Sequence, residues 1–257
     1  MTHTHVEPWS GAPPLLWFIE AVLPAIWLAV LLWLAWRSTR LRRATFGLLI
    51  LLSFSTLFWQ DAYINWGMYL LYNPNQTLMP WGSTLFTAPR KVWWTIFAYG
   101  IFWLVSIPAA LGAAAALRRH APAVNRTVSI IVTGVPLFYV WDLLFEGMAV
   151  RGGFYSYVDY WGPAIVMESG NMPLVFPILF IAACGAGFVW LLSWQTVDGH
   201  AGFERWFRLD RVAAGWRRET SRIGGWIVLI NAAHIVFCIV PLVAIRLLLL
   251  EPSQLVP

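Results

Sequence analysis

Acidic and amide side chains stand where the second long apolar run of the sequence ends. Asp61 directly follows Gln60, and Asn65 lies at i+4 from Asp61. Residues four apart share a face of a helix, so Asp61 and Asn65 form one polar patch beside Gln60. Asp142 and Glu146, in a later apolar run, have the same spacing. These residue types can do acid–base chemistry, because a carboxylic acid donates a proton and a carboxylate accepts one.

Carboxyl groups are costly in this setting. A charged carboxyl in lipid costs about 2.5–3.5 kcal/mol even on the most lenient scale. Counted at 1.5 Å per residue from the Arg-rich side, Asp61, Asp142 and Glu146 lie roughly 22 to 28 Å along their helices, and Glu20 lies about 8 Å deep from the other side. We expect all four to face one another across a cavity. Buried together, at least one should keep its proton near pH 7 and act as a general acid.

We expect the two loops near these carboxyls to cover the cavity as a lid. Residues 72–91 contain three Pro, two Asn and one Gly, and residues 151–173 carry several aromatic side chains. Tyr155 and Tyr157 can stack on, or hydrogen-bond to, a lipophilic and oxygenated ligand.

The composition indicates that a bilayer surrounds these elements. The chain is 60% hydrophobic and 11% charged, with a mean hydropathy of +0.66, whereas a soluble domain carries roughly 25% charged residues. The net charge of +5 does not indicate nucleic-acid binding, because the Arg residues cluster in short loops between apolar runs, as in membrane topology.

The apolar runs predict an all-α polytopic membrane helix bundle that forms one domain over residues 1–257. Each of the expected transmembrane helices has the about 20 residues that crossing needs. The six spans are 15–36, 45–66, 92–117, 127–150, 174–197 and 226–250.

The basic residues set the expected topology. Thirteen of the seventeen lie in the first, third and fifth connections, which should therefore be cytoplasmic. Both termini are then extracytoplasmic, as are the two loops near the carboxyls. We expect the first span to be retained, because no basic residue precedes it, and the host membrane to be the bacterial cytoplasmic membrane.

Other features of the chain favour structural roles. The stretch of about 200–218 has apolar residues at helical spacing with Arg on the other face, which predicts an amphipathic helix on the cytoplasmic membrane surface. Asn231 and His234 should lie only about 8–12 Å from the cytoplasmic side, distant from the carboxyls, and make a helix–helix hydrogen bond. Cys184 and Cys238 fall inside apolar runs and indicate no disulfide or metal site.

Known cofactor and nucleotide motifs are absent from the sequence. It has no HExxH, CxxC, GxGxxG, GxSxG or P-loop pattern. We therefore expect no cofactor and no metal, and either protein-only acid–base chemistry or binding without chemistry.

Two segments carry a resemblance to a known family. Trp59, Gln60 and Asp61, followed by Asn65 and then by Tyr72 with Asn73, resemble the spirocyclase AveC-like family of bacterial membrane proteins. Glu146, followed by the segment 151–157, is similar to the second region of that family. An acidic residue expected near Pro89 is replaced by Arg90, which changes the expected substrate contacts.

The resemblance implies a membrane cyclase or dehydratase that closes a lipophilic dihydroxy-ketone, a polyketide of secondary metabolism, into a spiroketal. Such closure needs an acid to remove a hydroxyl as water and a base for the attacking alcohol. We predict Asp61 and Glu146 as the acid–base pair, with Asp142 tuning them. The predicted substrate-binding residues are Gln60, Asn65, Tyr72, Asn73, Trp81, Tyr155 and Tyr157.

Two other functions fit the same residues. A membrane terpene or meroterpenoid cyclase would also use a buried carboxylic acid and aromatic walls. A small proton-coupled transporter or lipid-binding membrane protein would use the carboxyls to bind protons or cations. Transporters usually show repeats or broken helices at mid-membrane, and the sequence shows no repeat. The expected partners are the lipid bilayer and a lipophilic small molecule, with the oligomeric state left open.

Overall fold

The computed structural model describes residues 2–3, 11–79, 91–194, 201–253 and 255–256. Helical segments that are long and apolar enough to cross a membrane are Phe18–Arg40, Phe46–Gly67, Thr95–His120, Arg126–Arg151 and Trp216–Leu248. A further apolar helix, Ile178–Leu192, has 15 residues and is therefore about 22 Å long. The prediction of an all-α polytopic bundle is confirmed, while the side of the membrane that holds the termini stays a prediction.

Three of these segments consist of consecutive helical pieces. The first joins a π-helical turn, η1 (Phe18–Val22), to α1 (Leu23–Arg40). The second joins α2 (Phe46–Ser55), a 3-10 turn η2 (Thr56–Gln60) and α3 (Asp61–Gly67). The last joins α7 (Trp216–His234), a π-helical turn η5 (Ile235–Ile239) and α8 (Val240–Leu248). Continuous helices are α4 (Thr95–His120), α5 (Arg126–Arg151) and α6 (Ile178–Leu192).

Side-chain caps fix where two of the helices begin. Thr45 accepts a hydrogen bond from the backbone N–H of Leu48 at the start of α2. Asn125 accepts one from the backbone N–H of Val128 at the start of α5, at 2.9 Å. Each cap satisfies a backbone donor that the first helical turn leaves without an internal partner.

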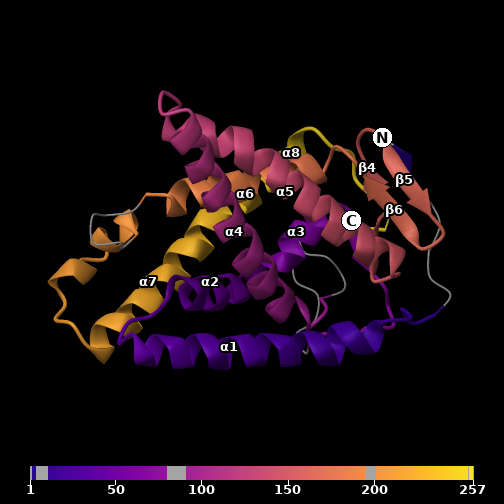
Figure 1. Cartoon of the computed structure of the whole chain (residues 1–257). Coiled ribbons are helices and arrows are strands. Elements are labelled where there is room, and N and C mark those ends of the chain that lie inside the picture. The colour runs from indigo at the N-terminus through magenta and orange to yellow at the C-terminus, as the bar shows by residue number, and fades with distance from the viewer. Residues whose placement is uncertain (1, 4–10, 80–90, 195–200, 254, 257) are drawn as a thin grey trace.

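Short antiparallel strand pairs gather at one end of the bundle (Figure 1). β2 (Leu70–Tyr72) pairs with β3 (Tyr155–Tyr157), and Tyr72 lies opposite Tyr155. The other pairs join β1 (Thr2–His3) to β4 (Asp159–Tyr160) and β5 (Ala164–Met167) to β6 (Gly170–Pro173). The β2–β3 pair connects the end of the second span to the loop after α5, so it brings two distant segments of the chain together.

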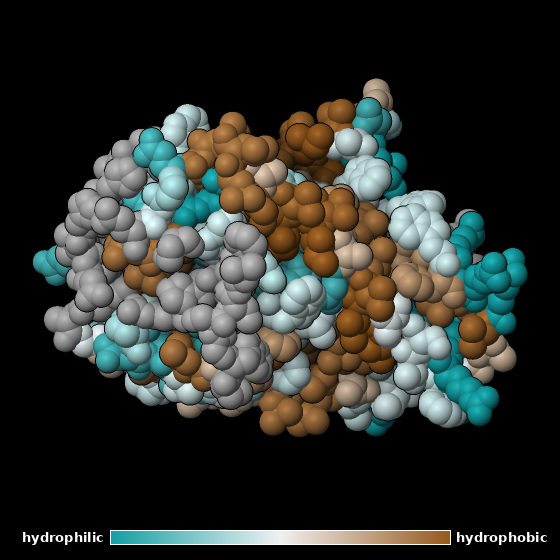
Figure 2. All heavy atoms as spheres, turned by 180° about the vertical axis from the view of Figure 1, so that it is seen from behind, coloured by the Kyte–Doolittle hydropathy of each residue, from teal (hydrophilic) through white to brown (hydrophobic). Residues whose placement is uncertain are grey.

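The outer faces of the helices are apolar, as expected for contact with lipid. Figure 2 shows a broad hydrophobic area across the middle of one face, with hydrophilic residues gathered toward its ends. Large side chains such as Trp33, Leu144 and Val228 are more than half exposed. Inside the bundle, Phe54, Trp103 and Phe188 pack ring against ring.

The segment predicted as one amphipathic helix over about 200–218 is not a single helix. Its described part forms two 3-10 turns, η3 (Gly202–Arg205) and η4 (Leu209–Arg211), before α7 begins. Arg208 has a φ of 53° and Gly215 a φ of 143°, and a right-handed helix cannot continue through such residues. Phe203 is fully buried while Trp206 is 60% exposed, so the apolar residues do not share one face.

An ion pair holds this segment against α7. Glu204 accepts hydrogen bonds from Nε and Nη2 of Arg222, both at 3.0 Å, and one from Nε1 of Trp226. Nη1 of Arg222 lies 2.7 Å from Glu219. Glu204 and Arg222 are both buried, so each needs its partner to offset the loss of hydration.

We expect Arg222→Met to lower the free energy of unfolding by about 3–5 kcal/mol, because it removes the two hydrogen bonds and the positive charge that Arg222 gives to the buried Glu204. The double variant Arg222→Met/Glu204→Met should recover much of this loss, since both charges of this buried pair are then replaced by apolar side chains. Denaturant unfolding in detergent measures both. A double variant less stable than Arg222→Met would contradict this account of the pair.

A glycine allows α6 to approach α5 closely. A Cβ atom on Gly185 would lie 2.6 Å from Cγ of Phe138, which is fully buried in α5. Gly112 in α4 has open space around it instead. The two positions therefore form a matched pair for testing the helix contact.

We expect Gly185→Ala to destabilise the bundle by about 1–3 kcal/mol through overpacking. The control, Gly112→Ala, should leave stability unchanged or raise it by up to about 1 kcal/mol, because Ala favours helix more than Gly does. Thermal unfolding of both purified variants is the measurement. Equal transition temperatures would show that the contact at Gly185 is not tight.

Candidate functional site

Asp61 lies at the point where the second span changes from a 3-10 turn to α3. Its Oδ2 accepts hydrogen bonds from Nδ2 of Asn65 at 2.7 Å and from the Tyr72 hydroxyl at 3.3 Å. Its Oδ1 accepts one from the Tyr99 hydroxyl at 3.0 Å. The Asp61–Asn65 spacing predicted from sequence therefore produces a direct contact, and two phenols from other elements complete the group.

Asp142 and Glu146 lie one turn apart on α5 and face the same cavity as Asp61. Glu146 Oε2 accepts a hydrogen bond from the Tyr157 hydroxyl at 2.7 Å, and Tyr155 lies beside it in the cavity wall. Asp142 is only 2% exposed. Its Oδ2 has no hydrogen-bond partner among the residues that the structure describes, which is rare for a buried carboxyl oxygen.

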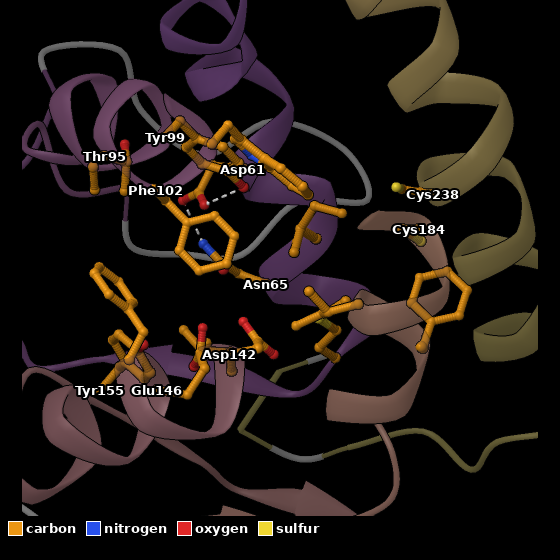
Figure 3. A pocket seen from close by; sticks show the side chains of 18 of the residues that line it. Asp61, Asn65, Thr95, Tyr99, Phe102, Asp142, Glu146, Tyr155, Cys184 and Cys238 are labelled. Carbon is orange, nitrogen blue, oxygen red and sulfur yellow. Dashed lines mark hydrogen bonds between the residues drawn. The ribbon is translucent and has the colours of Figure 1, made fainter. Parts of the chain in front are cut away.

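These side chains line one cavity in the bundle. It contains about 800 Å³ of atom-free space, including space at its mouth that is open to solvent. Apolar and aromatic side chains form most of its wall, among them Trp94, Phe102, Trp103 and Phe145. Figure 3 shows Asp61 with its bonds to Asn65 and Tyr99 on one side, and Asp142, Glu146 and Tyr155 across from them.

The phenols of the strand pair act as hydrogen-bond donors. Burial raises the pKa values of Tyr72, Tyr155 and Tyr157 well above the ordinary value of 10.0, because a phenolate would lose its hydration. The three hydroxyls therefore keep their protons at neutral pH. An oxygen of Asp61 or Glu146 that contacts one of them must act as the acceptor.

Some of the predicted site residues lie away from the cavity. Gln60 is fully buried but faces α7, where its amide hydrogen-bonds to Asn231 and His234. Asn73 donates to the backbone oxygens of Gly11 and Gly153, so it connects loops. Trp81 falls outside the described residues. Whether these three residues contact substrate stays a prediction.

The expectation that Glu20 joins the carboxyl cluster is wrong. Glu20 accepts hydrogen bonds from the backbone N–H and the hydroxyl of Thr77, at 2.6 and 3.0 Å. It does not line the cavity. A carboxylate near a helix end can accept hydrogen bonds from a neighbouring loop, and Glu20 accepts them from Thr77.

The prediction that His234 lies far from the carboxyls is also wrong. It assumed a last span beginning at residue 226, whereas α7 begins at Trp216, so His234 lies about 27 Å along its helix. His234 lines the cavity, and its ring meets that of Tyr99 edge to face at 6.4 Å. The predicted helix–helix hydrogen bond is confirmed, since Asn231 and His234 both bond to the second span.

Sequence reasoning missed other residues of the wall. Tyr99 and Thr95 of α4 and the thiols of Cys184 and Cys238 all line the cavity. The sequence did offer a clue to Tyr99 and Thr95, because both are polar residues near the start of an apolar span. Across the described residues, no group of three His, Cys, Asp or Glu side chains is placed to hold a metal ion.

Comparison with known proteins supports the resemblance seen in the sequence. The spirocyclase AveC-like family model matches residues 41–254, a range that includes Asp61, Asp142, Glu146 and the rest of the described cavity wall. Searches of curated proteins and of solved structures gave no match. Because the match covers most of the sequence, the chain belongs to the spirocyclase AveC-like family.

Proposed function

We propose that this chain is a membrane-embedded cyclase that closes a lipophilic, oxygenated substrate by carboxyl acid–base catalysis, with loss of water. The proposed substrate is a dihydroxy-ketone of the polyketide type, and the product is a spiroketal. The observation that carries the proposal is the convergence of Asp61, Asp142 and Glu146 in one cavity with mostly apolar walls. Family membership favours the same chemistry.

The hydrogen bonds around the carboxyls suggest different roles for them. Asp142 Oδ2 has no partner among the described residues, so as a neutral acid it can donate its proton to a substrate oxygen. Asp61 accepts from Asn65, Tyr72 and Tyr99, which holds it as an acceptor. Its Oδ1 receives a single described donor, and a carboxylate oxygen can accept a second from a substrate hydroxyl.

The proposed reaction has two ring closures. In the first, one substrate hydroxyl adds to the ketone carbon, and its proton passes to the carbonyl oxygen, which gives a hemiketal. Asp142 then protonates the hemiketal hydroxyl, the C–O bond breaks, and water leaves an oxocarbenium ion. The second hydroxyl attacks that carbon, and Asp61 takes its proton, which later returns to Asp142 through solvent in the cavity. The net change is loss of one water.

Glu146 has a supporting role in this scheme. Its carboxyl accepts a hydrogen bond from Tyr157, and it lies one turn from Asp142 on α5. A negative charge there would stabilise the neighbouring oxocarbenium ion and help Asp142 to keep its proton. This assignment differs from the sequence-based pairing of Asp61 with Glu146 by giving the acid role to Asp142.

We expect Asp142→Asn and Asp61→Asn each to slow turnover of a lipophilic dihydroxy-ketone by about 10²–10⁴-fold, the usual contribution of general acid–base groups. Purified protein in detergent and mass spectrometry of the product, lighter by one water, give the measurement. Glu168→Gln is the matched control, because Glu168 is an exposed loop carboxyl away from the cavity and should leave the rate unchanged.

Full activity in both Asp142→Asn and Asp61→Asn would refute the proposed mechanism. Conversion of a prenyl epoxide, with no reaction of the dihydroxy-ketone, would instead favour the terpene cyclase alternative. Substrate flux across proteoliposomes without any product would favour a transporter.

A further inference from the structure

A chain of side-chain hydrogen bonds connects the exposed side of η2, where Trp59 is 47% exposed, to the cavity. It begins at Trp59, passes through Asn231 and Gln60, and ends at His234. Gln60 is fully buried and His234 is 3% exposed. The cavity is reached only at the last member, because His234 lines it and the other three residues do not.

The first member fixes the orientation of the Asn231 amide. Nε1 of Trp59 lies 2.8 Å from Oδ1 of Asn231, and an indole N–H can only donate. On the other side of the same amide, Nδ2 lies 2.9 Å from the backbone oxygen of Ile227, which can only accept. Both contacts require the oxygen of Asn231 to face Trp59 and Gln60.

The Asn231 orientation in turn fixes Gln60. The Gln60 group that lies 2.9 Å from Oδ1 of Asn231 must be the donor, so it is Nε2. The amide oxygen, Oε1, then faces Nδ1 of His234 at 2.8 Å. An amide oxygen accepts and does not donate, and therefore Nδ1 of His234 carries a proton.

This assignment determines what His234 offers to the cavity. In a neutral imidazole with its proton on Nδ1, the lone pair is on Nε2. No described residue hydrogen-bonds to Nε2. The ring is held by stacking on Phe188, at a centroid distance of 6.1 Å and an interplanar angle of 14°, and by the edge contact with Tyr99.

We propose that His234 is a substrate-binding residue whose Nε2 accepts a hydrogen bond from an aliphatic hydroxyl in the cavity, and that Trp59, Asn231 and Gln60 are positioning residues that hold the Nδ1–H tautomer. This inference rests on the proposed function for the identity of the ligand. A dihydroxy-ketone has two hydroxyls, and each needs an acceptor. Asp61 serves one of them, and His234, joined to the Asp61 group through Tyr99, serves the other.

The tautomer can be measured without any substrate. Nitrogen NMR of the full chain in detergent, with isotopically labelled histidine, distinguishes the two ring nitrogens, and subtraction of the His234→Phe spectrum isolates His234. We expect the Nδ1–H tautomer in the wild type. Gln60→Leu removes the acceptor, and the tautomer should then change toward the Nε2–H form that dominates in free histidine.

Should Gln60→Leu fail to fold, the wild-type spectrum alone decides the tautomer, because Nε2–H in the wild type would overturn the assignment.

Hydroxyl binding is tested with a simple probe. Added decanol should shift the Nε2 resonance of His234, because a hydrogen bond to a ring nitrogen changes its shielding, whereas decane should leave it in place. No shift with decanol, or an equal shift with both compounds, would overturn the proposal for His234. Neither result depends on turnover, so failure here and failure of the proposed cyclase reaction can be told apart.

Discussion

The structure depends on satisfying carboxyl groups inside an apolar bundle. A buried carboxylate without hydrogen bonds would cost several kcal/mol, so donors must be placed around it by other parts of the fold. The β2–β3 pair supplies two of them, Tyr72 and Tyr157. Tyr72 lies opposite Tyr155 and Leu70 opposite Tyr157, and residues two apart on a strand share a face. One face of this small sheet therefore presents three phenols and a leucine to the cavity. Asp61 receives one donor from it and Glu146 another, while Asn65 and Tyr99 complete the donors of Asp61.

The same constraint gives a reason for the irregular helical turns. η2 ends immediately before Asp61, and η5 begins immediately after His234. Short 3-10 and π-helical turns inside helices are frequent at functional sites because they change the direction of side chains. At η2, the change allows adjacent residues to serve different partners: Gln60 bonds to α7, while Asp61 faces the cavity. In a continuous α-helix, the directions of these two neighbouring side chains would differ by a fixed angle of about 100° around the helix axis.

The sequence could predict what depends on local spacing. The i,i+4 pairs Asp61–Asn65 and Asp142–Glu146 follow from helix geometry, and the strong apolar runs indicate their helices. It could not predict the register of β2 on β3, since strands of three residues carry little pattern and the two strands lie more than 80 residues apart in the chain. His234 was misplaced for a different reason. The sequence predicted a loop before residue 226 because Arg217, Arg218 and Arg222 lie there. In the structure Arg222 belongs to α7 and is buried against Glu204 of η3. The helix is therefore longer than its apolar part.

The charged side chains of the cavity wall favour some types of reaction over others. Its described wall contains Asp61, Asp142 and Glu146 but neither Lys nor Arg. The nearby Arg246 instead stacks on Tyr69 at 3.6 Å and donates to the backbone oxygen of Val256. Reactions that build up negative charge, such as acyl or phosphoryl transfer, need cations or free donors at the reacting group. Here the phenol donors are already engaged by carboxyls. Carboxylates and aromatic faces such as Trp94 and Phe102 attract cations, so this wall favours a transition state that develops positive charge, as an oxocarbenium ion does.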